Sequence, residues 1–278
     1  MKSESRWSWL GTSFFTVLGL IYIAPIVIVL MNSFKKKTYI NMEPFKLPTE
    51  ETWYGLKNYV ASIDRYGLLD AVGWTVFITV FSVIVILICT SMCAWYITRV
   101  KGILSSGMYM LCAVSMVVPF QMVMFTLALI ADRLSLNTPW GLIIIYLGFG
   151  AGLAVFMFCG FVKSIPLEIE EAATIDGCNP LQIFFIIVLP IMKPTYVTVG
   201  ILETMWIWND FLLPYLVLDI NRFKTISIVI QYMKGSYGRV DMGAIMASLI
   251  LAVIPVVIFY LACQKHIIKG VAAGAVKG

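Results

Sequence analysis

The chain has 278 residues, of which 60% are hydrophobic and 13% charged, and its mean hydropathy is +0.92. Soluble globular domains carry about 25% charged residues, so this composition excludes that class and predicts a polytopic membrane protein. The net charge of +5 does not indicate nucleic-acid binding, because the lysines and arginines are scattered between apolar segments and form no patch.

Six apolar segments are long enough for helices that cross a bilayer, which requires about 20 residues. They are expected at about residues 10–31, 71–97, 107–130, 139–162, 195–217 and 242–263. The first is too long for a signal peptide and no small-residue cleavage site follows it, so we expect it to remain as a transmembrane helix. The sequence therefore predicts one all-α transmembrane domain over residues 1–278, with both termini on the same side.

The connections between the spans give less information about orientation and function. Lysines and arginines are as numerous on one side as on the other, so the positive-inside rule does not decide the orientation. Residues 32–70 form the longest polar connection and are interpreted as a solvated loop with interfacial aromatic residues, the alternative being a docking surface.

The residues of enzymes and metal sites are scarce. No Cys-x-x-Cys pair occurs, and His266 is the only histidine. The Gly-x-x-x-x-Gly-Lys-Ser/Thr loop that binds nucleotide phosphates is also absent. We therefore expect no catalytic site, metal or cofactor in this chain, and any ATP and Mg used with it would be bound by another polypeptide.

A polar segment at about residues 163–194 separates the fourth and fifth spans. Pro166 suits the first turn of a helix, and Gly177 is placed to end that helix. Asn179 can cap a second helix, with Gln182 completing a capping box. The helix dipole favours the acidic residues that fall in the first of these helices: Glu168, Glu170 and Glu171.

The same segment carries a recognisable spacing. Glu-Ala-Ala begins at Glu171, Gly177 follows after three residues, Ile187 after nine more, and Leu189-Pro190 after one further residue. This pattern resembles the cytoplasmic coupling loop of membrane subunits of bacterial ABC importers. The segment 208–214 and residues 270–278, at the end of the tail 264–278, are similar to the second permease subunit of maltose-type carbohydrate importers.

The resemblance implies a sugar importer of the bacterial cell (inner) membrane, with cytoplasmic termini. Its partners would be a second permease, two ATPase subunits, an extracytoplasmic sugar-binding protein and the lipid bilayer. The tail would insert between the ATPase subunits. The residues expected to couple the chain to the ATPases are Glu168, Glu171, Ala172, Ala173, Ile175, Asp176, Gly177, Leu181 and Pro190.

Polar residues inside the fifth span are candidates for a translocation path, because charged side chains in lipid are costly and tend to face the bundle interior. Glu203, Trp206 and Asp210 share one helical stripe beside Asn209, and Pro214 leaves the Asp210 carbonyl without its helical donor. Alternatively, the carboxylates are interhelical fasteners.

Two further groups of residues are weaker candidates. Ser115 and Gln121, around Pro119 in the third span, fit either a substrate contact or a kink in the helix. A segment between the last two spans resembles the loop that reaches toward the binding protein, or is a surface turn. Its residues are Lys234, Gly235, Ser236, Tyr237, Gly238 and Arg239.

The sequence thus predicts the permease subunit of an ATP-driven carbohydrate importer. One alternative is an ion-coupled secondary transporter, in which Glu203 and Asp210 would bind the coupling ion, but no internal repeat is evident. A polytopic membrane enzyme and an ABC permease for another small polar solute are the remaining alternatives.

Overall fold

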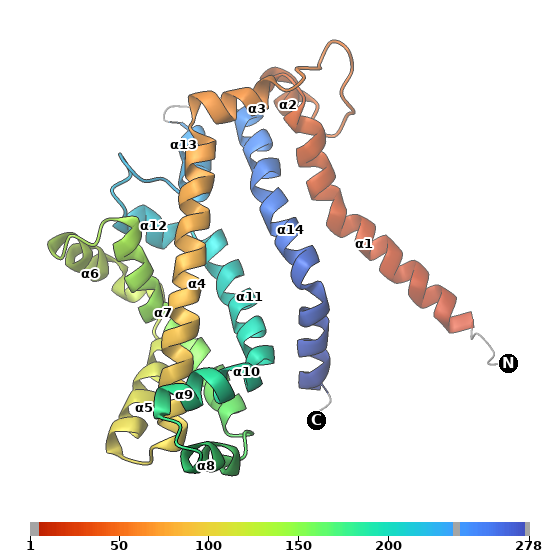
Figure 1. Ribbon diagram of the computed structural model, residues 1–278. Coiled ribbons are helices and arrows are strands. Elements are labelled where there is room, and N and C mark those ends of the chain that lie inside the picture. The colour runs from red at the N-terminus through yellow and green to blue at the C-terminus, as the bar shows by residue number, and fades with distance from the viewer. Residues whose placement is uncertain (1–5, 236–239, 276–278) are drawn as a thin grey trace. The chain divides into compact units, whose positions relative to one another are not determined.

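The computed structural model describes residues 6–235 and 240–275 and is helical throughout most of that length (Figure 1). Within these residues the β-type pairing is one isolated antiparallel bridge between Lys35 and Trp53. The predicted all-α fold is therefore confirmed. The chain divides into two compact units, one formed by Met1–Leu69 and Val229–Pro255, the other by Asp70–Ile228 and Val256–Gly278.

The first unit contains the first apolar helix and the polar segment that follows it. Its helices are α1 (Arg6–Ser33), α2 (Lys37–Met42), α3 (Lys57–Val60) and η1 (Ala61–Arg65). Two longer helices, α13 (Ile226–Met233) and α14 (Met242–Ala275), begin or end in the other unit.

The polar segment 32–70 packs more tightly than a solvated loop. The buried Asn58 amide donates to the carbonyls of Ser33 and Lys35 at 2.8 and 2.9 Å. Lys35 itself is 1% exposed and donates to the Glu43 carbonyl. Burial lowers the pKa of the Lys35 ammonium, which the Glu43 carboxylate partly offsets. Buried side chains thus satisfy the carbonyls of Ser33, Lys35 and Glu43, which composition alone does not reveal.

Gly243 allows α14 to pass close to Asn58. A Cβ atom at position 243 would lie 2.7 Å from Cγ of Asn58, whose amide already makes two hydrogen bonds. We expect Gly243→Ala to destabilise the chain by about 1–3 kcal/mol, because the amide must move. Gly148→Ala is the control, since no atom lies within 4 Å of its Cβ position. Thermal unfolding in detergent compares them, and equal midpoints would contradict the close approach.

The second unit contains the remaining helices. They are α4 (Leu68–Arg99), α5 (Ile103–Val117), α6 (Phe120–Arg133), α7 (Pro139–Val162), α8 (Leu167–Ile175), α9 (Pro180–Gln182), η2 (Ile183–Val188), α10 (Leu189–Ile191), α11 (Lys193–Asn209) and α12 (Leu212–Val217). Much of α7 is buried in the apolar core of this unit, where Tyr146 and Phe158 are fully enclosed.

Among residues 6–235 and 240–275, four helices are individually long and apolar enough to cross a membrane: α1, α4, α7 and α14. Two bent pairs raise the number to six if each pair counts as one span. The predicted continuous span over 107–130 is one of these pairs: α5 and α6 meet at an angle of 108°. Val118 is extended there, because a residue that precedes proline is pushed out of the helical region.

The ends of the last two spans also differ from the sequence prediction. The span expected over 195–217 is interrupted, since α11 ends at Asn209, Asp210 is extended and α12 is a separate short helix. The segment expected as a tail from residue 264 continues α14 as a helix to Ala275.

Candidate functional site

The polar segment between α7 and α11 begins with the helix α8. Pro166 precedes this helix as its N-cap rather than occupying its first turn. The helix ends at Ile175, and Gly177 has a φ of +87°, which glycine adopts without strain. The amide of Cys178 then donates to the Ala173 carbonyl, which satisfies an orphan carbonyl of the last turn. The predicted stop at Gly177 is confirmed.

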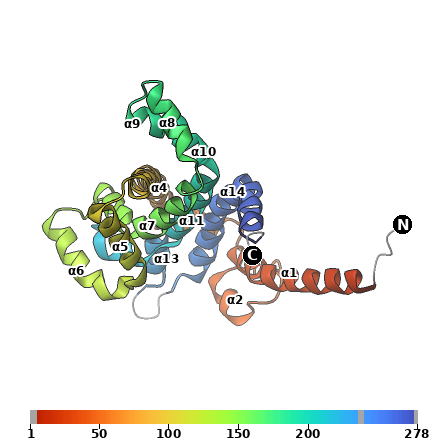
Figure 2. The same ribbon diagram turned by 90° about the horizontal axis from the view of Figure 1, so that it is seen from below.

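The second helix, α9, starts as predicted from its capping residues. The Asn179 side chain accepts from the Gln182 amide, and the Gln182 side chain accepts from the Asn179 amide, both at 2.9 Å. Pro180 occupies the first turn. The chain continues through η2 and α10 and bends by 78° into α11. Figures 1 and 2 show α8 and α9 at the end of this unit where α4 ends, extending outward from α4, α5 and α7.

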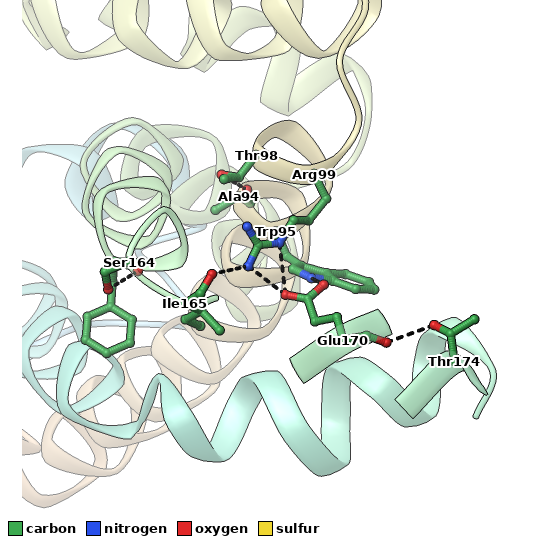
Figure 3. Close-up of polar contacts among 9 residues, drawn as sticks. Ala94, Trp95, Thr98, Arg99, Ser164, Ile165, Glu170 and Thr174 are labelled. Carbon is green, nitrogen blue, oxygen red and sulfur yellow. Dashed lines mark hydrogen bonds and ion pairs between the residues drawn. The ribbon is translucent and has the colours of Figure 1, made fainter. Parts of the chain in front are cut away.

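An ion pair fastens α8 to the end of α4 (Figure 3). Oε1 of Glu170 accepts from Nε and Nη2 of Arg99 at 2.9 and 2.7 Å. Oε2 accepts from the Trp95 indole at 2.9 Å, so both carboxylate oxygens are satisfied. The Glu170 side chain is 8% exposed and that of Arg99 is 18% exposed. We call the three side chains of Glu170, Arg99 and Trp95 the α4–α8 clamp.

Further contacts extend the clamp into the neighbouring turns. Arg99 Nη2 also donates to the Ile165 carbonyl at 2.9 Å, just before α8. The Trp95 ring packs against Phe184 of η2 at a centroid distance of 5.6 Å. The sequence reasoning missed the clamp. The available signal was Arg99, a bidentate donor at the end of an apolar helix, combined with three neighbouring glutamates.

With one exception, the residues predicted to couple the chain to ATPases are exposed. Ile175 is 86% exposed and Leu181 58% exposed. Ala173 is 6% exposed and packs into the core, so its methyl group is not part of this surface. The exposed members are Glu168, Glu171, Ala172, Ile175, Asp176, Gly177, Leu181 and Pro190. We call these eight residues the α8 face.

The polar residues predicted in the fifth span meet α7. Asp210 accepts from the Tyr146 hydroxyl at 3.0 Å, and the Tyr146 ring packs edge-on against Trp206 at 5.4 Å. Glu203 is 2% exposed, and its Oε2 atom has no hydrogen-bond partner within the described residues. A Cβ at Gly150 would lie 3.0 Å from that atom. Glu203, Trp206 and Asp210 thus share one face toward α7.

The other candidates are dispersed. Asn209 is exposed and donates to the Met205 carbonyl of its own helix. Ser115 donates to Cys112 within α5, at the contact with α7, whereas Gln121 is exposed on α6. In the proposed binding-protein loop, Lys234 and Gly235 are exposed, and Ser236, Tyr237, Gly238 and Arg239 lie outside the described residues.

Residues 87–273 match the family model described as binding-protein-dependent transport system inner membrane component. The chain belongs to this family. The matched region includes the α4–α8 clamp, the α8 face and the polar residues of α11. With four to six candidate spans, this permease is a multi-pass membrane protein.

Two relatives and one solved structure agree with this assignment. The permease is 40% identical to the probable starch degradation products transport system permease protein AmyC of Thermoanaerobacterium thermosulfurigenes, over 94% of each chain. It is 35% identical to the multiple sugar-binding transport system permease protein MsmG of Streptococcus mutans, over the whole of both. A bacterial ABC transporter involved in alginate import shares its fold, with a TM-score of 0.75, 20% identity and coverage of 95% and 99% of the two chains. The predicted resemblance to carbohydrate ABC importer permeases is confirmed.

Proposed function

We propose that this permease translocates a sugar or oligosaccharide across the cell membrane in an ATP-driven importer. Its membership of the binding-protein-dependent family supports import. Relatives named for starch degradation products and for multiple sugars support a carbohydrate cargo. The permease would act with a second permease subunit, two ATPase subunits that bind ATP and Mg, and an extracytoplasmic binding protein, while its own termini lie in the cytoplasm.

The α8 face is the proposed docking surface for an ATPase subunit. The observation that carries this proposal is that one short helix is open on one side and firmly fixed on the other. Its outer side offers the Glu171 carboxylate and the apolar Ile175, and α9 adds the exposed Leu181. Its inner side is held by the Glu170–Arg99 ion pair. An ATPase subunit that displaces α8 would therefore also displace α4, because the clamp prevents α8 from tilting independently.

In the proposed mechanism, alternating access, this connection lets movement of the ATPase subunits change the side of the membrane to which the translocation path opens. ATP-dependent closure of the ATPase subunits would favour one orientation of the membrane helices only if the closed assembly stabilises that orientation. The break at Asp210 lies between α11 and α12, where irregular backbone is tolerated if it lines an aqueous cavity or is buried in protein. We assign the exposed side chains of Trp206 and Asn209 near this break to the translocation path, whereas Glu203 is buried toward α7.

Charge reversal on the α8 face tests the coupling. In a reconstituted transporter we expect Glu171→Lys to lower substrate-dependent ATP hydrolysis and uptake about tenfold, within the usual range of coupling between two sites. Glu171 is exposed, so folding should be unaffected. Glu50→Lys, an exposed reversal in the polar segment 32–70, is the matched control. Uptake by Glu171→Lys equal to that of the control would refute ATPase docking on this face.

A further inference from the structure

A cavity of about 440 Å³ opens where α4 ends, α5 begins and α7 ends. Thr98 of α4, Ser105, Ser106 and Tyr109 of α5, and two lysines, Lys101 and Lys163, contribute polar groups to its lining. Ile97 and Met110 supply apolar surface beside them. This cavity is separate from the α8 face and from the polar residues around Asp210, and neither proposed role uses it.

The charge in this cavity is of one sign. Lys101 and Lys163 line it without an aspartate or glutamate, and neither ammonium has an ion-pair partner among the residues that the structure describes. Each lysine brings three N–H donors and no acceptor. Both lysines are exposed, and an anion bound between their ammonium groups would offset their mutual repulsion.

Neutral donors add to this arrangement. Thr98 and Ser105 donate to the Ala94 and Gly102 carbonyls, so their hydroxyl hydrogens are already used. The hydroxyls of Ser106 and Tyr109 make no hydrogen bond to the described part of the protein. The cavity therefore offers two cations and two free hydroxyl donors, a set that matches an anion with several acceptor oxygens.

We propose that this cavity binds a phosphate group, with Lys101 and Lys163 as its charged ligands. Phosphate supplies enough oxygen atoms to accept from both ammonium groups and from the hydroxyls of Ser106 and Tyr109. The headgroup of an anionic lipid is the expected source of this phosphate. Ile97 and Met110 would contact its apolar part. The cavity lies at the ends of α4 and α7, which are long and apolar enough to cross a membrane, and lipid headgroups are expected at such helix ends.

The location relative to α8 strengthens the choice of a lipid. The cavity and α8 lie at the same end of this unit, because α4 ends there and α7 leads into α8 (Figure 1). If α8 faces the cytoplasm as proposed, the cavity faces the leaflet whose anionic lipids attract nearby lysines. Binding itself does not depend on ATPase coupling and is measured without it.

Lipid binding to the full chain tests this proposal. The chain in nanodiscs of phosphatidylcholine containing a small fraction of phosphatidylglycerol should retain phosphatidylglycerol through extraction and mass measurement. We expect the Lys101→Gln/Lys163→Gln double variant to bind it about thirtyfold more weakly, from the loss of two charges. The control is Lys193→Gln, an exposed lysine at the start of α11 that does not line the cavity.

A second arm identifies the source of the phosphate. Inorganic phosphate is titrated into the unmodified chain and both variants in neutral detergent. If the unmodified chain and Lys193→Gln bind inorganic phosphate and the double variant does not, the cavity is assigned to a soluble phosphate compound. Retention of phosphatidylglycerol without binding of inorganic phosphate would assign it to a lipid headgroup. The proposal is overturned if the double variant and Lys193→Gln bind both probes as the unmodified chain does. Matching thermal unfolding of the two variants ensures that a loss of binding is not a loss of fold.

Discussion

We expect the Glu170→Ala variant to lose about 3–5 kcal/mol of stability, together with substrate-dependent ATP hydrolysis by the assembled transporter. The change leaves the Arg99 guanidinium largely buried with no carboxylate, and an unpaired charge in such a position is strongly destabilising. The Trp95 indole loses its acceptor in the same step. Thermal unfolding of the purified chain measures the first effect, and ATP hydrolysis in proteoliposomes measures the second.

The adjacent glutamate provides a matched control. Glu171 is exposed, so Glu171→Ala should unfold at the same temperature as the unmodified chain while still weakening ATPase docking. Glu170→Ala should therefore reduce both stability and coupling, whereas Glu171→Ala should reduce coupling alone. Equal unfolding temperatures for Glu170→Ala and Glu171→Ala would show that the clamp does not hold α8.

The Arg99→Met/Glu170→Ala double variant distinguishes loss of the ion pair from the presence of an unpaired buried charge. Removing both partners leaves no uncompensated buried charge, so the double variant should be more stable than Glu170→Ala alone. Coupling should remain impaired in it, because α8 is no longer fastened to α4. Recovery of stability without recovery of coupling would show that the clamp positions α8 for its function.

The caps and turns around α8 were accessible from the sequence because they are local. The stop at Gly177 and the capping box of Asn179 and Gln182 depend on residues at most a few positions apart. Their chemistry is the same in any fold. The bend at Pro119 was flagged as a possible kink for a similar reason, although its size, 108°, depends on packing between helices.

Contacts between distant segments could not be derived in this way. Glu170 and Arg99 are 71 residues apart in the sequence. Three glutamates within four positions are each possible carboxylate partners for Arg99. Which of them turns inward depends on the rotation of α8 against α4. The same limit applies to Ala173, which was assigned to the outer face but packs inward.

Asp210→Ala should cost about 2.5–4 kcal/mol of stability, because Asp210 makes two kinds of hydrogen bond at once. Its Oδ1 accepts from the amides of Leu212 and Leu213 at 3.0 and 3.4 Å, which begins α12. Loss of a side-chain oxygen that accepts from the first amides of a helix costs about 1 kcal/mol. Its Oδ2 accepts from the buried Tyr146 hydroxyl, and a hydrogen bond to a charged group contributes about 1.5–3 kcal/mol. Thermal unfolding of the purified chain measures the sum.

Two milder substitutions distinguish the hydrogen bonds of Asp210 to the α12 amides from its hydrogen bond to Tyr146. Asp210→Asn keeps an oxygen for the α12 amides, whereas Tyr146→Phe removes only the hydroxyl. In a double-mutant cycle, Asp210→Ala and Tyr146→Phe should be less destabilising together than the sum of the single variants, because they share one hydrogen bond. If Asp210→Ala instead unfolds like the unmodified chain and loses only uptake, Asp210 is a path residue and not a fastener of α7, α11 and α12.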